Sequence, residues 1–175
     1  KAPTGTGKTC AFGIPVAEHI DPEKKYPQAV IMAPTRELAQ QIAEELTELT
    51  YFMPEVQVAC VYGGANMEKQ ARRLAEGCQI VVATPGRLMD HYKHHSIDLA
   101  HVTQVVLDEA DEMLNMGFYK DVRHIIELMK ARKSLSMFSA TISREVMDIG
   151  WLYQNNAEEC AGLLCCGSGH WCSQL

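Results

Sequence analysis

Residues Thr103 to Phe118 read TQVVLDEADEMLNMGF, an apolar run that ends abruptly in carboxylates. Asp108, Glu109, Asp111 and Glu112 place four acids within five residues, and like charges this close repel one another. The run before them has the β-branched, apolar character of a strand that is buried on both faces. Acids at the carboxyl end of such a strand indicate an α/β fold, because ligands gather at that edge of its sheet.

Apolar runs and helical patterns alternate along the rest of the chain. Five runs predict strands: Gln28 to Ala33, Val56 to Tyr62, Gln79 to Ala83, Val102 to Leu107 and Ser134 to Phe138. Six segments predict helices: Lys8 to Ile20, Glu37 to Thr50, Met67 to Glu76, Arg87 to Lys93, Asp121 to Lys130 and Glu145 to Tyr153. Pro15 is expected to kink or stop the first helix. The alternation predicts βαβ units and a mostly parallel sheet with helices on both faces.

Length and composition limit the class of protein. The 175 residues fit one domain, and 47% of them are hydrophobic, enough for a sizeable core. No stretch approaches ~20 uninterrupted apolar residues, so we expect no membrane span and a cytoplasmic location. The net charge of −6 argues against a broad basic surface for nucleic acid but leaves room for a local site. Cys10, Cys60 and Cys78 lie in apolar segments and are predicted to be buried, reduced thiols.

The segment Ala2 to Thr9 reads APTGTGKT and predicts a phosphate-binding loop. Its glycines let several backbone N–H groups converge on an anion at the start of a helix. Lys8 would reach the β- and γ-phosphates of ATP, and the Thr9 hydroxyl would bind Mg²⁺. The predicted ATP-binding residues are Thr4, Gly5, Thr6, Gly7, Lys8 and Thr9. A flexible Gly/Thr turn is the alternative interpretation.

This loop explains the acids at the end of the strand. Asp108 would hold Mg²⁺, partly through water, and Glu109 would orient and deprotonate the water that attacks ATP. The bound metal would offset the repulsion between the two carboxylates. Together with Lys8 they are the predicted catalytic residues. The alternative is that the acids only complement the dipole of a helix N-terminus.

Six motifs in order resemble the first RecA-like domain of DEAD-box ATP-dependent RNA helicases. They are APTGTGKT at Ala2, PTRELAQQ at Pro34, GG at Gly63, TPGR at Thr84, DEAD at Asp108 and SAT at Ser139. The resemblance covers Lys1 to about Gln154 and implies a RecA-like P-loop NTPase fold that uses ATP and Mg²⁺.

The resemblance also implies an RNA path and a coupling network. The implied RNA-binding residues are Pro34, Thr35, Arg36, Gly64, Thr84, Gly86 and Arg87. Asp111, Ser139 and Thr141 would couple the state of ATP to a second RecA-like domain. In PTREL and TPGRL an arginine follows a small residue at a helix start, which suits RNA phosphates and predicts low sequence specificity.

Several of these residues have plainer alternatives when each is taken alone. Arg36 and Arg87 would be surface ion-pair residues, and Gly63 and Gly64 would be an ordinary strand-ending turn. The histidines His91, His94 and His95 suggest a metal cluster, but a solvated helix face is the favoured interpretation.

The family pattern includes parts that the sequence does not match. In the family a strand and an adenine-reading segment precede the loop, and a second RecA-like domain supplies arginines to the γ-phosphate. We therefore expect the isolated chain to hydrolyse ATP poorly and not to unwind RNA. Residues 155–175 differ in composition from residues 1–154 and predict a disordered tail without a zinc site.

Three functional hypotheses follow from these residues. The first is the ATP-binding half of an RNA helicase core, with RNA and a second RecA-like domain as partners. The second is a non-catalytic fragment with a P-loop-like fold that neither turns over ATP nor clamps RNA alone. A P-loop ATPase that acts on something other than nucleic acid is disfavoured, because PTREL, GG and TPGR would have no role in it.

Overall fold

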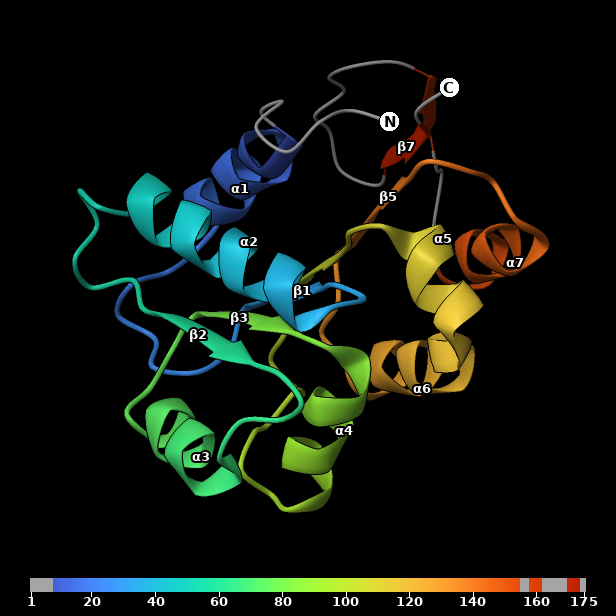
Figure 1. Cartoon of the computed structure of the whole chain (residues 1–175). Coiled ribbons are helices and arrows are strands. Elements are labelled where there is room, and N and C mark those ends of the chain that lie inside the picture. Colours follow the sequence, from blue (N-terminus) through green and yellow to red (C-terminus); the bar gives the residue numbers. More distant parts are fainter. Residues whose placement is uncertain (1–7, 155–157, 162–169, 174–175) are drawn as a thin grey trace.

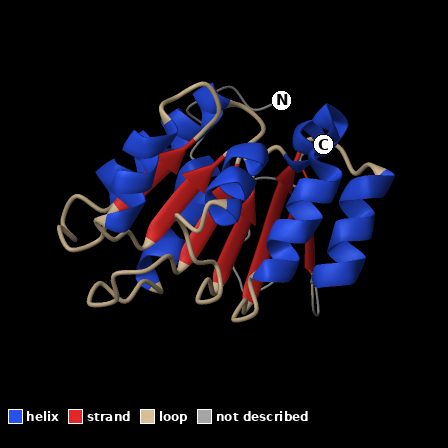
Figure 2. Ribbon diagram, turned by 90° about the horizontal axis from the view of Figure 1, so that it is seen from below, coloured by secondary structure: helices blue, strands red, loops and turns tan. Residues whose placement is uncertain are grey.

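A parallel sheet runs through the computed structural model, which describes residues 8–154, 158–161 and 170–173. Its strands are β1 (Ala29–Met32), β2 (Val58–Val61), β3 (Ile80–Ala83), β4 (Gln104–Leu107), β5 (Ser134–Ser139), β6 (Glu158–Ala161) and β7 (His170–Ser173). They lie in the order β2-β3-β1-β4-β5-β7-β6. Figure 2 shows the strands as red arrows that lie side by side between blue helices. Met32 lies opposite both Ala83 and Leu107, so the central strands end level at one edge.

Helices cover both faces of this sheet (Figure 1). They are α1 (Lys8–Glu18), α2 (Arg36–Leu49), α3 (Met67–Ala75), α4 (Pro85–Lys93), α5 (Ala110–Met113), η1 (Leu114–Phe118), α6 (Tyr119–Leu128) and α7 (Arg144–Tyr153). Alternate residues of β1 face opposite layers: Ala29 and Ile31 pack with α1 and α2, while Val30 and Met32 belong to the core under the other helices. The predicted α/β fold is confirmed, and burial on both faces explains why the strands are apolar throughout.

Side-chain caps determine where three of the helices begin. Thr35, Asn66 and Ser143 each accept a hydrogen bond from the backbone N–H three residues later, at 3.3, 2.8 and 3.3 Å. Such a cap satisfies one of the backbone donors that a helix start leaves free. Thr35 follows β1 after only two residues, so its cap starts α2 close to the carboxyl end of the strand.

The five predicted strands and six predicted helices are present, but three details differ from the sequence analysis. Pro15 does not stop the first helix, since α1 continues to Glu18. The helix pair α5 and η1 was not predicted; it turns at Gly117, whose φ of 90° suits a residue without a Cβ. Cys10 is exposed, whereas Cys60 is partly buried and Cys78 is buried.

The segment that was predicted to be a disordered tail contains two strands. β7 pairs with β5 from Met137 to Ser139, and β6 pairs in turn with β7. The backbone of these eight residues extends the sheet, although their composition gave no strand pattern. Residues 155–157, 162–169 and 174–175 lie outside the described part, where the disordered tail stays a prediction.

None of the helices in residues 8–154 combines the length and the apolarity that crossing a membrane would require.

Candidate functional site

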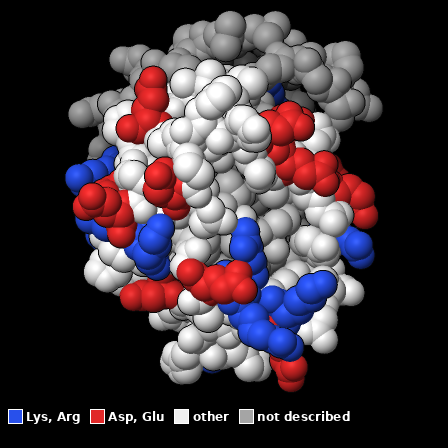
Figure 3. Space-filling model, turned by 90° about the vertical axis from the view of Figure 1, so that its left-hand side faces the viewer, with Lys and Arg blue, Asp and Glu red and all other residues white. Residues whose placement is uncertain are grey.

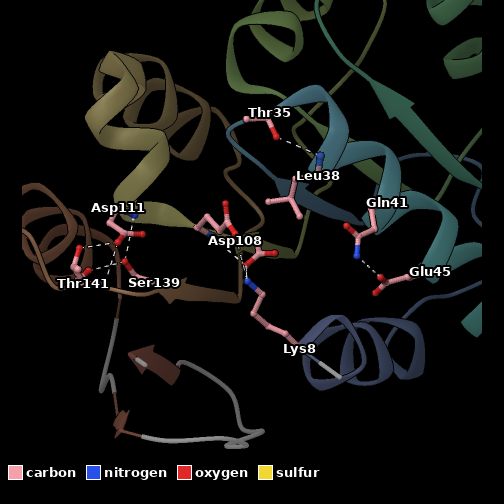
Figure 4. A network of polar contacts seen from close by, with 10 residues as sticks. Lys8, Thr35, Leu38, Gln41, Glu45, Asp108, Asp111, Ser139 and Thr141 are labelled. Atoms are coloured by element: carbon pink, nitrogen blue, oxygen red, sulfur yellow. Dashed lines mark hydrogen bonds and ion pairs between the residues drawn. The ribbon is translucent and has the colours of Figure 1, made fainter. Parts of the chain in front are cut away.

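Lys8 and Asp108 meet where the start of α1 faces the end of β4 (Figure 4). Lys8 Nζ lies 3.0 Å from Asp108 Oδ1 and 3.9 Å from Glu109 Oε1. Asp108 is fully buried, and its backbone N–H donates to Met32 O at 2.9 Å, which continues the strand pairing with β1. Burial raises the pKa of Asp108, and the Lys8 ammonium opposes that shift. The structure thus brings together the three residues that were predicted to be catalytic.

Glu109 turns the chain from β4 into α5 with a left-handed backbone, φ 50° and ψ 51°. Its N–H donates to Asp108 Oδ1 at 3.0 Å, which holds the two acids in a fixed relation. The Glu109 side chain is 48% exposed, so water can reach it although Asp108 is closed off. Partial burial raises the pKa of Glu109, Lys8 lowers it, and the neighbouring acids raise it further. A water-accessible carboxylate of this kind can accept a proton.

The residues around Asp108 fit a Mg²⁺ ion that is held mainly by other ligands. Asp108 Oδ2 is buried, and no donor among the described residues bonds to it. Thr9, the second residue of α1, is also buried. No cluster of three or more His, Cys, Asp or Glu side chains in the described ranges could hold a metal alone. Mg²⁺ at nucleotide sites takes one or two carboxylates beside phosphate and water, which agrees with this donor set.

Four of the predicted ATP-binding residues, Thr4, Gly5, Thr6 and Gly7, lie outside the described residues. The described part of the motif is the start of α1, which presents Lys8 toward the acids.

Asp111 joins α5 to the end of β5 (Figure 4). Its Oδ2 accepts hydrogen bonds from Thr141 N at 3.0 Å and Thr141 Oγ1 at 2.6 Å. Its N–H donates to Ser139 Oγ at 3.3 Å, and Ser139 Oγ donates to Thr141 O at 2.6 Å. Burial alone would raise the pKa of Asp111, but hydrogen bonding with Thr141, with Ser139 and with the backbone outweighs burial and lowers that pKa. The three residues predicted to be a coupling network are therefore in direct contact.

The crowded acids have separate surroundings, which resolves their repulsion. Asp108 pairs with Lys8, Asp111 binds the turn after β5, Glu109 is half-exposed and Glu112 is exposed.

The residues predicted to bind RNA follow three neighbouring strands. One group follows β1 and consists of Pro34, Thr35 and Arg36, and Gly64 follows β2. Another group follows β3 and consists of Thr84, Gly86 and Arg87. Because the strand order is β2-β3-β1-β4-β5, these residues lie on one side of the acids along a shared edge, and Ser139 and Thr141 lie on the other.

Some of these residues already have structural tasks. The Thr35 hydroxyl caps α2, whereas Thr84 is the N-cap of α4 without a side-chain cap bond. Arg36 is exposed. Arg87 is half-buried, and its Nη1 donates to Ala65 O at 3.1 Å in the turn that contains Gly64. Arg87 is therefore tied to the loop after β2, which its sequence pattern did not indicate.

The sequence analysis missed the environment of His91. Neither a metal cluster nor a solvated helix face describes it, since His91 is fully buried in α4 while His94 and His95 are exposed. Its Nε2 lies 3.1 Å from Oε1 of Gln70, a buried residue of α3 that we did not single out. The signal was weak, because a polar residue close to the charged Asp90 and Lys93 is typical of an exposed helix position.

A model of the DEAD/DEAH box helicase family matches residues 1–149. The ATP-dependent RNA helicase CshA of Listeria monocytogenes is 47% identical over 158 residues, which are 90% of this chain and 30% of that protein. The ATP-dependent RNA helicase DeaD of Escherichia coli is 45% identical over 158 residues, 90% of this chain and 25% of that protein. The chain therefore spans less than a third of the length of these relatives.

Solved structures agree with the sequence matches. A hypothetical ATP-dependent RNA helicase from Sulfolobus tokodaii superimposes with a TM-score of 0.80 and 35% identity, over 91% of this chain and 50% of that one. The yeast DEAD-box splicing factor Prp28 gives a TM-score of 0.79 and 33% identity, over 91% and 43%. With the family model covering 149 of the 175 residues, this chain belongs to the DEAD/DEAH box helicase family.

Proposed function

We propose that this chain is the ATP-binding half of the motor core of an ATP-dependent RNA helicase. ATP would bind at Thr4 to Thr9, and RNA would bind through backbone contacts at the ends of β1, β2 and β3. A second RecA-like domain would complete the site, and the protein would act in the cytoplasm. The relatives named ATP-dependent RNA helicases support this proposal.

One observation carries the proposal: the motifs line one edge of the sheet in a spatial order that separates two functions. GG, TPGR and PTREL follow β2, β3 and β1, whereas DEAD follows β4 and SAT begins at the last residue of β5. A ligand along the first three strands would therefore lie beside a nucleotide bound at Lys8 and Asp108. This proximity favours a nucleic-acid-stimulated ATPase over a P-loop enzyme with an unrelated substrate.

Within this site the residues of the chain have distinct tasks. Bound Mg²⁺ would supply positive charge to the phosphates, with Asp108 and Thr9 as its protein ligands, partly through water. Lys8 would bind the β- and γ-phosphates, and Glu109 would orient the attacking water and take its proton. Asp111, Ser139 and Thr141 would pass a change at Asp108 to the turn after β5, because the network starts three residues from that acid.

RNA-stimulated ATP turnover tests the proposal. We would build a chimera, called the DeaD chimera below, in which this chain replaces the matching segment of E. coli DeaD and is joined to the rest of that helicase. We expect single-stranded RNA to increase its ATP turnover and the Lys8→Ala chimera to lose turnover. ATP binding by the 175-residue chain is measured alongside.

The outcomes separate the hypotheses. If the chain binds ATP but RNA does not increase the ATP turnover of the chimera, the helicase proposal is contradicted. A chain that binds neither ATP nor RNA supports the non-catalytic alternative.

A further inference from the structure

Arg36 is held in place by two side chains although it is exposed. Its guanidinium carbon lies 4.9 Å from the centre of the Tyr62 ring. Its Nε donates to Gln40 Oε1 at 3.4 Å, and Gln40 Nε2 donates in turn to Tyr62 Oη at 3.0 Å. A free arginine samples many rotamers, so a ring and an amide that contact the same guanidinium restrict where its charge lies.

The backbone of Tyr62 is bound by a second group of residues. Gln70 is buried in α3, and its Nε2 donates to Tyr62 O at 3.1 Å. Gln70 Oε1 faces both His91 Nε2 at 3.1 Å and Arg87 Nη1 at 3.4 Å. Gln70 thus links the end of β2 to α4.

The two ends of the turn after β2 are fastened by different residues. Tyr62 stands before Gly63 and is bound by Gln70, while Ala65 follows Gly64 and accepts from Arg87 Nη1 at 3.1 Å. Gly64 has a φ of +81°, and an added Cβ at Gly63 or Gly64 would meet nothing within 4 Å. The glycines therefore turn an open loop, and its position depends on residues at its ends.

The hydrogen bonds determine the state of His91. Because the Gln70 amide nitrogen donates to Tyr62 O, its oxygen must accept, and His91 Nε2 therefore carries the proton. His91 Nδ1 is buried and has no partner among the described residues. With the proton on His91 Nε2, Gln70 Oε1 accepts from both His91 and Arg87.

We propose that Tyr62 and Gln70 are positioning residues that fix Arg36 and Arg87 relative to each other on the RNA-binding edge. Tyr62 is the shared member: its ring contacts Arg36, and its carbonyl connects through Gln70 to Arg87. This inference rests on the proposed function, since it explains how two arginines from separate helices keep one spacing for RNA phosphates. Neither residue needs to touch RNA.

Double-mutant cycles on the 175-residue chain test the Tyr62 part, with binding of a labelled single-stranded oligouridylate as the readout. Tyr62→Leu is expected to weaken binding about 2- to 5-fold, the scale of an exposed cation–π contact. In an Arg36→Ala background the same change should have almost no effect, because the residue it positions is gone. Tyr62→Phe keeps the ring and is expected to retain most of the affinity.

A parallel cycle tests Gln70. Gln70→Leu should weaken binding about 2- to 30-fold, and much less when Arg87 is already Ala. Since Gln70→Leu leaves buried polar groups without partners, Gln70→Glu is the second variant. Its carboxylate still accepts from Arg87 but cannot donate to Tyr62 O. It should keep the fold, as checked by circular dichroism, and still weaken binding.

NMR of the arginine side chains gives a readout that needs no RNA. We expect slow guanidinium rotation for Arg36 and Arg87 in the native chain, and faster rotation in Tyr62→Leu and Gln70→Leu respectively. Free rotation in the native chain, or additive losses in both cycles, would overturn the positioning role. If guanidinium rotation is slow but the chain binds no RNA, the proposed function is overturned. The positioning role, which rests on that function, is then overturned as well.

Discussion

Glu109 holds its backbone in the left-handed region, which residues with a Cβ rarely adopt. Such strain persists where the surroundings enforce it: here Asp108 Oδ1 binds the Glu109 N–H at 3.0 Å, and β4 and α5 lie on either side. The turn directs one acid inward to Lys8 and leaves the next one open to water. Identical chemical groups at adjacent positions thereby have different surroundings.

Replacing Glu109 by Gln in the DeaD chimera should remove most ATP turnover while nucleotide binding changes little. The amide keeps the shape of the side chain but cannot accept a proton, and general-base catalysis is worth about 10²- to 10⁴-fold. Steady-state turnover and the nucleotide dissociation constant are measured for each variant. Lys8→Ala is the contrast, since it should weaken binding itself. Full turnover in Glu109→Gln would contradict the assignment.

His91 should make the chain less stable in acid. Burial and the Arg87 charge lower its pKa, with a smaller opposing contribution from Asp90 and a further lowering from His94. The unfolded chain, with an ordinary histidine pKa near ~6.5, then binds more protons than the native one in acid. The stability that a neutral His91 provides is complete above that value and is lost as pH falls through the lowered native pKa.

His91→Gln removes this dependence, because glutamine does not titrate. Denaturant unfolding at pH about 7.5 and about 5.5 should show a smaller loss of stability on acidification for His91→Gln than for the native chain. His124→Gln, at an exposed position of α6, is the matched control and should follow the native chain. An equal loss of stability on acidification in all three proteins would contradict the prediction.

At the scale of elements, the contact between α1 and α2 depends on a glycine. A Cβ on Gly13 would lie 2.8 Å from Leu49 Cδ1 and 2.9 Å from Leu46 Cδ2, closer than carbon atoms pack. The two helices can therefore approach closely, and α1 carries Lys8 at its first residue. The close packing at this buried glycine thus helps to determine the position of Lys8 relative to β4.

Gly13→Ala should destabilise the chain by up to about 2 kcal/mol. Alanine favours a helix by up to about 1 kcal/mol over glycine, but forcing a methyl into a filled core costs about 1–3 kcal/mol. Gly86→Ala in α4 is the control, because its Cβ would meet Phe118 at an ordinary 3.7 Å. The free energies of unfolding of both variants and of the native chain, measured in denaturant, test this prediction. A Gly13→Ala chain more stable than the native one would mean that the leucines move aside readily.

The elements also mark how far the sequence could predict the structure. Strands and long helices follow from apolar periodicity, and Lys8, Asp108 and Asp111 follow from motifs that have a chemical reason. Gln70 and His91 could not be found in this way, since their burial results from α3 packing beside α4 rather than from any local pattern. The same applies to β7, whose pairing with β5 joins residues more than 30 positions apart.

At the scale of the whole molecule, charge is distributed rather than concentrated. The face in Figure 3 carries acidic and basic side chains close together, in keeping with a net charge of −6. An acidic protein can still bind RNA if a few well-placed groups meet its phosphates. The two arginines beside the starts of α2 and α4 would be such groups.

RNA binding by the 175-residue chain should therefore depend only weakly on salt. For two neutralised phosphates on a single strand, log K should fall with log salt at a slope of about −1 to −2. Titrations of several single-stranded RNAs at two or more salt concentrations test this expectation. Arg87→Ala should weaken all sequences alike, because backbone contacts carry no base information. A steep slope, or a strong preference for one sequence, would indicate that residues other than these arginines bind the RNA.

The ion pair between Lys8 and Asp108 implies an order of events at the nucleotide site. The Lys8 ammonium lies 3.0 Å from the buried Asp108 carboxylate, and its positive charge offsets the attraction of that carboxylate for a bare divalent cation. A bound triphosphate would offer Lys8 another anion and would free Asp108 for the metal. We therefore expect free Mg²⁺ to bind weakly without nucleotide, and nucleotide and metal to bind together as one complex.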